Sequence, residues 1–358
     1  MSGQGPAWAI LLQKVFGLQG NYPNGLLAFV ALFFIYLFLI VPGAWIISYV
    51  DRKLGADFQA RVGPNRAGPS GFFQPLADFL KLMQKDSQEK ITTSDLLWII
   101  VFSSALYSSV AVIPLGSSFL MVDTDLSAFI PFLSALVLAL GTMLLGFSRP
   151  TVPGWFGAIK VAGQAFSGAF PALISLLTAG IRSGGFRWSH LANSQGASPM
   201  DWAAFSNPFQ FLALIVFMIS GLVMMCLPPM EGVVLPINMN GGVTAHLYGR
   251  RWAIFRLGRF YASFLWSLVA SVLFLGGWQL PEQVNDLLSD SLILKQSLES
   301  ILLLSKTFIM MLIVIWVSRV NPRTRVDQVT DFAWKVLSPF ALLALVGSAI
   351  WAGWGLLI

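Results

Sequence analysis

Eight stretches of the chain are each long and apolar enough to cross the hydrocarbon core of a lipid bilayer as a single helix. That core is about 30 Å thick, so a spanning helix needs about 20 consecutive, mostly apolar residues. A helix also satisfies its own backbone hydrogen bonds, which lipid cannot do. The predicted spans are about 27–49, 96–115, 128–147, 157–181, 208–228, 259–280, 299–319 and 334–356.

These spans predict an all-α polytopic membrane protein, with a single transmembrane domain over residues 27–356 and an N-terminal segment over 1–26. Composition favours the same class. Hydrophobic residues make up 56% of the chain and charged residues 11%, whereas soluble domains carry about 25% charged residues. No Ala-x-Ala cleavage pattern follows the first apolar run, so we expect it to remain as an uncleaved anchor. The long loops are 50–95 and 229–258.

The cations lie mostly on one side of the predicted bundle. Of the 22 Lys and Arg residues, 17 belong to the odd-numbered loops and the adjoining span ends, four lie on the opposite side, and Lys306 lies within a span. Loops rich in Lys and Arg stay on the cytoplasmic side. We therefore expect the odd-numbered loops in the cytoplasm and both termini on the opposite side. The net charge of +6 then reflects topology and gives no support to nucleic-acid binding.

The first of these loops contains the stretch DRKLGADFQARVGPNRAGPSGFFQPLADFLKLMQKD, residues 51–86. Residues 72–85 predict an amphipathic helix after the first span, because apolar and polar side chains fall on opposite faces at helical spacing. Such a helix lies in the bilayer interface or packs on the bundle surface, and the two are compatible. Its apolar face comprises Phe72, Leu76, Phe79, Leu80 and Met83, and its polar face Gln74, Asp78, Lys81 and Lys85.

The segment before that helix, residues 61–70, combines two Gly-Pro pairs with two arginines. Proline fixes its own backbone and restricts the residue before it, while glycine permits unusual angles. Arg61 and Arg66 are therefore expected on a stiff, hairpin-like loop near the membrane surface. Arginine forms paired hydrogen bonds with anionic groups. The loop either anchors to lipid headgroups or docks a partner protein or an anionic ligand.

Several motifs carry a family resemblance that covers about residues 27–355. They are Asp51-Arg-Lys, Phe58-Gln-Ala-Arg-Val-Gly-Pro-Asn-Arg66, Ala77-Asp-x-x-Lys-Leu, Gly154-Trp155, Gln164, Gly276-Gly-Trp278, Lys306-Thr307, Asn321-Pro-Arg-Thr-Arg-Val-Asp-Gln328 and Phe332-Ala-Trp-Lys335. Together they resemble the H subunit of bacterial NADH-quinone oxidoreductase, which corresponds to subunit 1 of respiratory complex I. The resemblance identifies the chain as a divergent member of that family, in the bacterial cytoplasmic (inner) membrane.

The resemblance implies a non-redox membrane subunit of a proton-translocating enzyme, placed where the membrane arm meets the hydrophilic arm. Its partners would be other membrane-arm subunits and the subunits that carry the iron–sulfur clusters and the quinone site, with quinone as a substrate at a shared site. No cofactor of its own is implied. The sequence is consistent with this expectation. It contains no dinucleotide glycine fingerprint, it has a single cysteine, and its two histidines, His190 and His246, lie apart. We predict no metal site.

The resemblance also implies which residues form the quinone chamber or dock the hydrophilic arm. They are Asp51, Arg52, Arg61, Pro64, Asn65, Arg66, Gln74, Asp78, Lys81, Lys85, Glu231, Arg323, Arg325, Asp327, Asp331 and Lys335. A simpler explanation exists for two pairs. Asp78 and Lys81 are three residues apart, and Asp331 and Lys335 four apart, so each pair could form a surface ion pair worth about 0.2–0.5 kcal/mol.

The family's glutamates, which serve proton movement, are largely missing. Ala169 stands where the fourth span of the family has an acid, and Glu231 alone remains in a loop that is acidic in the family. His246 and Arg259 lie near or at further family glutamate positions. The proton-path candidates that remain are Asp51, His246 and Lys306. A reduced acidic path, assisted by acids of neighbouring subunits, is the resulting hypothesis.

Lys306 is the only charge deep within a predicted span. Intramembrane ionisable residues commonly mark functional sites, whereas the simpler explanation is a lysine that extends toward one end of the span. No carboxylate partner is evident in the spans, so its partner could be water, backbone carbonyls or an acid of a neighbouring subunit.

Two other functional classes remain open at this point. The chain could belong to a related membrane-bound hydrogenase-type complex, or it could be an assembly scaffold without a proton-path role. A secondary transporter is disfavoured because the sequence contains no detectable internal repeat.

Overall fold

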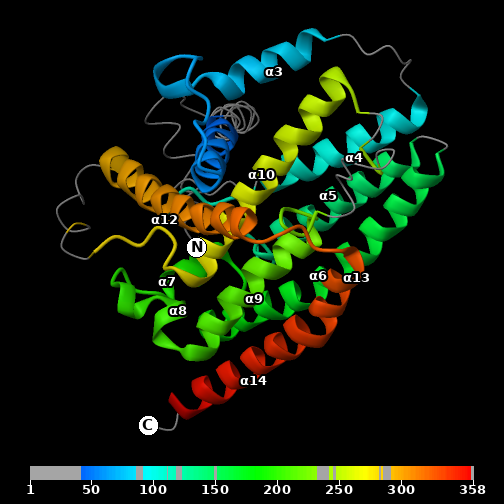
Figure 1. The fold of residues 1–358 in the computed structure, drawn as a ribbon. Helices are drawn as coiled ribbons and strands as arrows, with labels where there is room; N and C mark the ends of the chain where they lie inside the picture. Colours follow the sequence, from blue (N-terminus) through cyan, green and yellow to red (C-terminus); the bar gives the residue numbers. More distant parts are fainter. Residues whose placement is uncertain are drawn as a thin grey trace, which may run out of the picture.

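The computed structural model describes residues 42–85, 92–110, 112–117, 123–148, 151–231, 242–244, 247–281, 284 and 292–355. Within these ranges the chain forms helices joined by turns and loops, without β-strands. Figure 1 shows the long helices packed as a bundle, with α3 near the start of α10 and the C-terminal helix α14 along the opposite edge.

Five helices of the described residues are long and apolar enough to cross a membrane, which confirms a helical polytopic membrane protein. They are α5 (Phe129–Phe147), α6 (Val152–Ser183), α10 (Gly249–Phe274), α12 (Leu292–Val320) and the run Val326–Gly353, which includes α13 (Val326–Phe332), a π-helical turn (Ala333–Leu337) and most of α14 (Ser338–Gly355).

Two further helices lie where spans were predicted. A shorter apolar helix, α9 (Pro208–Met224), occupies the fifth predicted span, and α4 (Thr93–Val110) occupies most of the second. The first predicted span lies mostly outside the described residues, as does the N-terminal segment. The total of eight spans therefore stays a prediction.

The helices do not always begin and end where the predicted spans do, because the spans were placed by hydropathy and a helix can include polar residues. α10 begins at Gly249 and not near 259, because arginines at its start lower the hydropathy without breaking the helix. α9 ends at Met224 and not near 228, before a cis peptide bond that joins Pro228 and Pro229. The first helix continues through residue 58, so Asp51 and Arg52 lie on a helix and not in the predicted loop.

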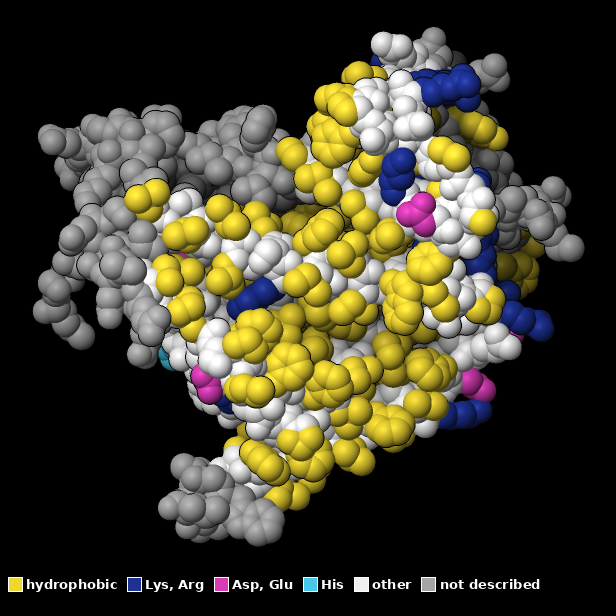
Figure 2. Space-filling view, turned by 60° about the vertical axis from the view of Figure 1, so that its left-hand side comes forward, with side chains coloured by type: hydrophobic (Ala, Val, Ile, Leu, Met, Phe, Trp, Pro, Cys, Tyr) yellow, Lys and Arg dark blue, Asp and Glu magenta, His cyan; other side chains and the backbone are white. Residues whose placement is uncertain are grey.

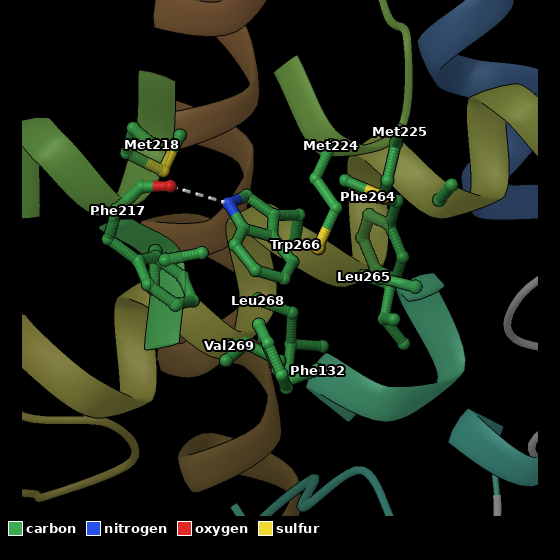
Figure 3. Packing of buried hydrophobic residues seen from close by; sticks show 14 of the residues in the cluster. Phe132, Phe217, Met218, Met224, Met225, Phe264, Leu265, Trp266, Leu268 and Val269 are labelled. Carbon is green, nitrogen blue, oxygen red and sulfur yellow. Dashed lines mark hydrogen bonds between the residues drawn. The ribbon is translucent and has the colours of Figure 1, made fainter. Parts of the chain in front are cut away.

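The core between α9 and α10 is built around a stacked aromatic pair (Figure 3). The rings of Phe217 and Trp266 are nearly parallel, at 7°, with centroids 4.2 Å apart. The indole Nε1 of Trp266 donates to the backbone carbonyl of Phe217 over 2.9 Å. Gly221 permits this approach, because a Cβ there would lie 1.9 Å from the same nitrogen. This packing fixes α10, whose first half carries the arginines of the candidate site.

The outer surface of the bundle is rich in apolar side chains, and Figure 2 shows them covering much of one face. Ile309 and Trp316 of α12 are 56% and 54% exposed, and Leu343 and Ile350 of α14 are 51% and 60% exposed. Contiguous apolar surface of this extent marks contact with lipid or with other subunits.

Candidate functional site

A cavity of about 320 Å³ lies between the helix over residues 42–58, α10, α12 and the segment that follows α9. Its lining is unusually rich in charge for the interior of a membrane protein. The charged lining residues are Asp51, Glu231, Arg256, Arg259, Arg319 and Arg323. The structure thus brings together three of the predicted site residues, Asp51, Glu231 and Arg323, with three arginines that were not among them.

Glu231 is the central carboxylate of this cavity and is only 6% exposed. One oxygen accepts a hydrogen bond from Arg259 of α10 over 3.1 Å, and the other lies 3.4 Å from Arg323, which follows α12. Arg259 also donates to the backbone carbonyl of Cys226 over 2.9 Å. A single acid therefore joins three segments that are far apart in the sequence.

Asp51 forms the second ion pair of the cavity. Its Oδ1 accepts from the Nε of Arg319 over 3.0 Å, and its Oδ2 accepts from a terminal nitrogen of the same guanidinium. Two parallel bonds of this kind are stronger and more directional than a single one. The pair connects the first described helix to the end of α12.

A smaller cavity of about 100 Å³ adjoins the first, between the helix over residues 42–58, α3 (Gln74–Gln84) and α10. Its lining is mostly apolar and includes Trp45, Leu76, Phe79 and Leu257. Arg256 lines both cavities.

Asp78 of α3 pairs with Arg52 across the smaller cavity, at 2.5 Å, and not with Lys81 as the surface-pair explanation expected. Gln74 donates to the other oxygen of Asp78 over 3.0 Å. Partial burial acts to raise the pKa of this carboxyl, but the hydrogen bonds from Arg52 and Gln74 outweigh it and lower the pKa below 3.8. The predicted amphipathic helix thus exists, and its polar face holds it to the bundle through Asp78. Lys81 and Lys85 are exposed.

The predicted arginine loop folds back against the first described helix. Trp45 donates from its Nε1 to the carbonyl of Phe72 over 2.8 Å, and Tyr49 donates to the carbonyl of Ser70 over 3.1 Å. Gly71 has φ of 79°, and a Cβ there would lie 2.2 Å from the carbonyl oxygen of Pro64. The chain therefore closes tightly at a position that only glycine accommodates.

The side chains that this loop presents are open to the outside. Arg61, Asn65 and Arg66 are exposed, Pro64 is half-buried, and Val62 is 82% exposed. None of these residues lines either of the two cavities described above. The structure thus separates the predicted set into a cavity group and an exposed loop group.

The last predicted group, around α13, also lies mostly at the surface. Arg325 is the N-cap residue of α13, and Asp327 lies exposed in its first turn. Lys335 and Asp331 form the predicted ion pair four residues apart, at 2.6 Å, with both side chains well exposed. Of the last-loop residues, only Arg323 lines the charged cavity.

Lys306 lies at the other end of α10, buried to 7% exposure. Its Nζ donates to the carbonyls of Leu275 and Gly277 over 2.8 and 2.9 Å, and it lies 4.3 Å from the ring centroid of Trp202. The sequence allowed water, backbone carbonyls or an acid of a neighbouring subunit as the partner of Lys306. In the structure its partners are backbone carbonyls at the negative end of the α10 helix dipole. It does not extend to the surface. His246 falls outside the described residues.

Comparison with known proteins decides the family. A family model described as NADH dehydrogenase matches residues 30–349 of the chain. The chain belongs to the NADH dehydrogenase family.

Relatives of this NADH dehydrogenase family chain are named as the H subunit of NADH-quinone oxidoreductase. The protein from Chlorobaculum parvum is 29% identical over 341 residues, which cover 93% of this chain and 94% of the relative. The protein from Rubrobacter xylanophilus is 29% identical over 316 residues, covering 87% and 92%. That from Anaeromyxobacter dehalogenans is 29% identical over 317 residues, covering 84% and 76%. The predicted identity as a divergent H-type chain of this oxidoreductase is confirmed.

One of the departures noted from the sequence, Arg259, lines the charged cavity. Arg259, at a position where the resemblance implies a glutamate, pairs with Glu231 at 3.1 Å. A sequence signal that could have grouped Arg256 with Arg259 is their spacing of three on one helix, which places both on the same face. Arg319 and Asp51 are 268 residues apart, and no local pattern predicts their contact.

Another ion pair, which is buried, was also not predicted from the sequence. Arg251 of α10 lies 3.2 Å from Asp95 of α4, and their side chains are 7% and 2% exposed. Asp95 also accepts from the backbone and hydroxyl of Thr92 over 3.0 and 2.9 Å. This pair holds α4 to the start of α10 and lies outside the charged cavity.

Proposed function

We propose that the chain is a non-redox membrane subunit of a proton-translocating quinone oxidoreductase, and that it forms part of the quinone chamber. The observation that carries the proposal is the cavity of about 320 Å³ lined by Asp51, Glu231 and Arg323, in a member of the NADH dehydrogenase family. Its lining combines apolar side chains, which suit a quinone ring, with charged groups that can bind the ring oxygens. No redox centre of its own is needed, because electrons arrive from partner subunits.

The exposed arginine loop is proposed to dock the hydrophilic arm. Arg61 and Arg66 are exposed on a loop that Trp45, Tyr49 and Gly71 hold in one shape. A preformed loop loses little conformational entropy on binding, and arginine suits acidic partner surfaces. The partners are the iron–sulfur and quinone-site subunits of the hydrophilic arm, together with other membrane-arm subunits.

Eight spans in the bacterial inner membrane, with odd-numbered loops in the cytoplasm, complete the proposal. The cation distribution supports it, and so does the gathering of Arg52, Arg256, Arg259, Arg319 and Arg323 around two adjoining cavities. That end of the bundle would face the hydrophilic arm.

Proton movement is proposed to pass through a reduced acidic path. Asp51 is the candidate that lines the cavity, and His246 stays a sequence-based candidate. Lys306 donates to two carbonyls, so its role in this path would be a fixed positive charge. Acids of neighbouring subunits would supply the remaining groups.

The test uses the complete complex, purified through a tag on this chain. Changing Arg61 and Arg66 to Gln is expected to reduce the iron–sulfur subunits that co-purify, while Arg187→Gln, in an exposed pair with Asp125, leaves them unchanged. Asp51→Asn is expected to lower quinone reduction with the arm still attached. Full quinone reduction by the Asp51 variant, together with normal arm binding by the loop variants, would refute the proposal.

The scarcity of family acids favours a second candidate, a related hydrogenase-type membrane complex. What supports it is Arg259, which stands where the resemblance implies a glutamate. The same purification separates the two, because NADH-oxidising subunits co-purify in one case and a hydrogen-activating subunit in the other. Recovery of neither would instead favour an assembly scaffold.

A further inference from the structure

Gln164 of α6 is a buried polar residue that has no part in the proposed function. It is among the motif residues that carry the family resemblance, which implies no role for it. Its side chain is 0% exposed. The amide Nε2 donates to the backbone carbonyl of Met230 over 2.6 Å and to that of Val223 over 3.1 Å. One side chain therefore contacts both ends of the segment that joins α9 to Glu231, called here the connecting segment (residues 225–231).

The connecting segment is held by groups from other elements. Two successive prolines in it carry no N–H donor, and its carbonyls lie outside a helix, so partners must come from elsewhere. Arg259 of α10 donates to the carbonyl of Cys226 over 2.9 Å. The backbone nitrogen of Thr324 donates to the carbonyl of Pro229 over 3.3 Å. Gln164 supplies a further anchor, at the last peptide of the segment.

The bond to Met230 bears directly on Glu231. The Met230 carbonyl and the Glu231 N–H belong to one planar peptide unit, so a hydrogen bond to that carbonyl fixes the plane from which the glutamate side chain projects. Glu231 in turn bonds Arg259 and lies 3.4 Å from Arg323. The Gln164 amide thereby acts on groups that line the charged cavity, although it is not among the lining residues itself.

The orientation of the Gln164 amide follows from its neighbours. Because Nε2 bonds two carbonyls, the reverse orientation would set Oε1 against two carbonyl oxygens. Oε1 accepts no hydrogen bond among the described residues, and a buried acceptor without a donor is costly. An apolar side chain of equal volume would avoid that cost but would leave the Met230 carbonyl without this donor. The carbonyls that the amide holds therefore explain its presence.

We propose that Gln164 is a positioning residue of the quinone chamber, which fixes the peptide before Glu231 and, through Glu231, sets the place of Arg259 and Arg323. The effect on quinone rests on the proposed function, whereas the positioning of Glu231 rests on the hydrogen bonds alone. Gln164 contributes to binding only through Glu231. Loss of its amide is expected to weaken quinone binding without slowing the reaction of bound quinone.

The test is a double-mutant cycle between Gln164 and Glu231 in the purified complex. Gln164→Met is close to glutamine in volume and removes both hydrogen bonds. It is expected to raise the KM for a short-chain quinone about fivefold, which corresponds to one lost hydrogen bond, and to leave kcat unchanged. Combined with Glu231→Gln, the same substitution should not raise KM further, because the residue that it positions has lost its charge. Gln164→Asn keeps a shorter amide and should give an intermediate KM.

Gln210→Met is the matched control. Gln210 of α9 is 1% exposed, its Nε2 donates to the carbonyl of Thr178 over 2.7 Å, and its Oε1 accepts no hydrogen bond among the described residues. It lies at the opposite end of α9 from the connecting segment. This variant is expected to lower the thermal midpoint about as much as Gln164→Met and to keep the wild-type KM. A raised KM in both variants would assign the effect to general destabilisation and overturn the proposal.

Thermal midpoints of the same variants form a second cycle, which does not involve quinone. Midpoint losses that simply add for Gln164→Met and Glu231→Gln would overturn the positioning of Glu231. Coupled losses with a wild-type KM in Glu231→Gln would support the positioning and refute the proposed function at this residue. A raised KM in Glu231→Gln, with an unchanged KM in Gln164→Met, would overturn the role of Gln164 and leave the proposed function standing.

Discussion

The two ends of α10 differ in how they accommodate a positive charge, half-buried at Arg256 and buried at Lys306. Near its start, Arg256 faces two cavities and has no acceptor among the described residues. Just past its end, the carbonyls of Leu275 and Gly277 and the ring of Trp202 surround Lys306. About 28 Å of helix separates Arg256 from Leu275, at 1.5 Å per residue. The comparison teaches that a buried cation indicates a binding site only when its acceptors are missing from the fold.

The chemistry of the two side chains fits this division. The ammonium of Lys306 is a compact donor that converges on two carbonyls, which a helix end leaves unpaired. The guanidinium of Arg256 is a planar fork suited to a ligand with two oxygens. One end is therefore closed by the backbone, whereas the other remains open to ligands and partner subunits.

The largest expected effect is at the closed end. Lys306→Met should destabilise the protein by about 3–6 kcal/mol, because two buried carbonyls each lose a bond to a charged donor worth about 1.5–3 kcal/mol. The thermal midpoint of the purified complex measures this. Lys335→Met is the matched control, since its ion pair is well exposed and worth about 0.3–0.5 kcal/mol. Similar midpoints for the two variants would remove the contrast between the ends of α10.

A smaller loss is expected at the open end. Glu231→Gln should cost about 3 kcal/mol, because Arg259 loses its counter-charge in a largely buried position. The same variant should lower quinone reduction, measured with a short-chain quinone in the purified complex. Combining Glu231→Gln with Arg259→Gln should restore part of the stability, because the uncompensated charge is removed. Additive losses in the double variant would argue against a coupled pair.

In the arginine loop, Gly71→Ala should destabilise the protein by about 1–3 kcal/mol. Gly71→Ala introduces a side chain at positive φ and against the carbonyl of Pro64, at the cost expected for a strained residue. Gly184→Ala is the control, because Gly184 has a similar φ of 66° with nothing within 4 Å. Only the Gly71 variant should lose hydrophilic-arm subunits during purification. Equal retention in both variants would show that loop shape is irrelevant to docking.

The smallest effect concerns pH at α3. The lowered pKa of Asp78 means that its bond with Arg52 stabilises the fold above about pH 4, and that this stability is lost as pH falls through the lowered pKa. Asp78→Asn should therefore speed hydrogen exchange in α3 at pH 6, by an amount equivalent to about 0.5–1 kcal/mol. The difference from wild type should shrink below pH 4. A difference that persists there would assign the effect to packing.

The sequence predicted the local features well, and for a physical reason. Apolar runs of about 20 residues located α5 almost to the residue, 128–147 against Phe129–Phe147. Helical periodicity located α3 and the surface pair of Asp331 and Lys335. These features depend on neighbours within a few residues, so a linear pattern records them.

The site was predicted only in part. Asp51, Glu231 and Arg323 were named and do line one cavity, whereas Arg256 and Arg319, which line it too, were not among the predicted site residues. Loop residues such as Arg61 were placed in the same set, yet they lie apart from both cavities. Sequence motifs mark that residues matter to a family, but they do not say which of them share a space.

The sequence alone determined that this chain is a helical membrane protein, because lipid imposes length and polarity on each segment independently. Its motifs also predicted the family. The tertiary structure decided which charges cancel. Arg319 meets Asp51, Arg52 meets Asp78, Lys306 meets two carbonyls, and Arg256 meets no carboxylate or carbonyl of the described residues. Such pairing depends on how separate helices are turned toward one another, and packing over long sequence separations sets those rotations.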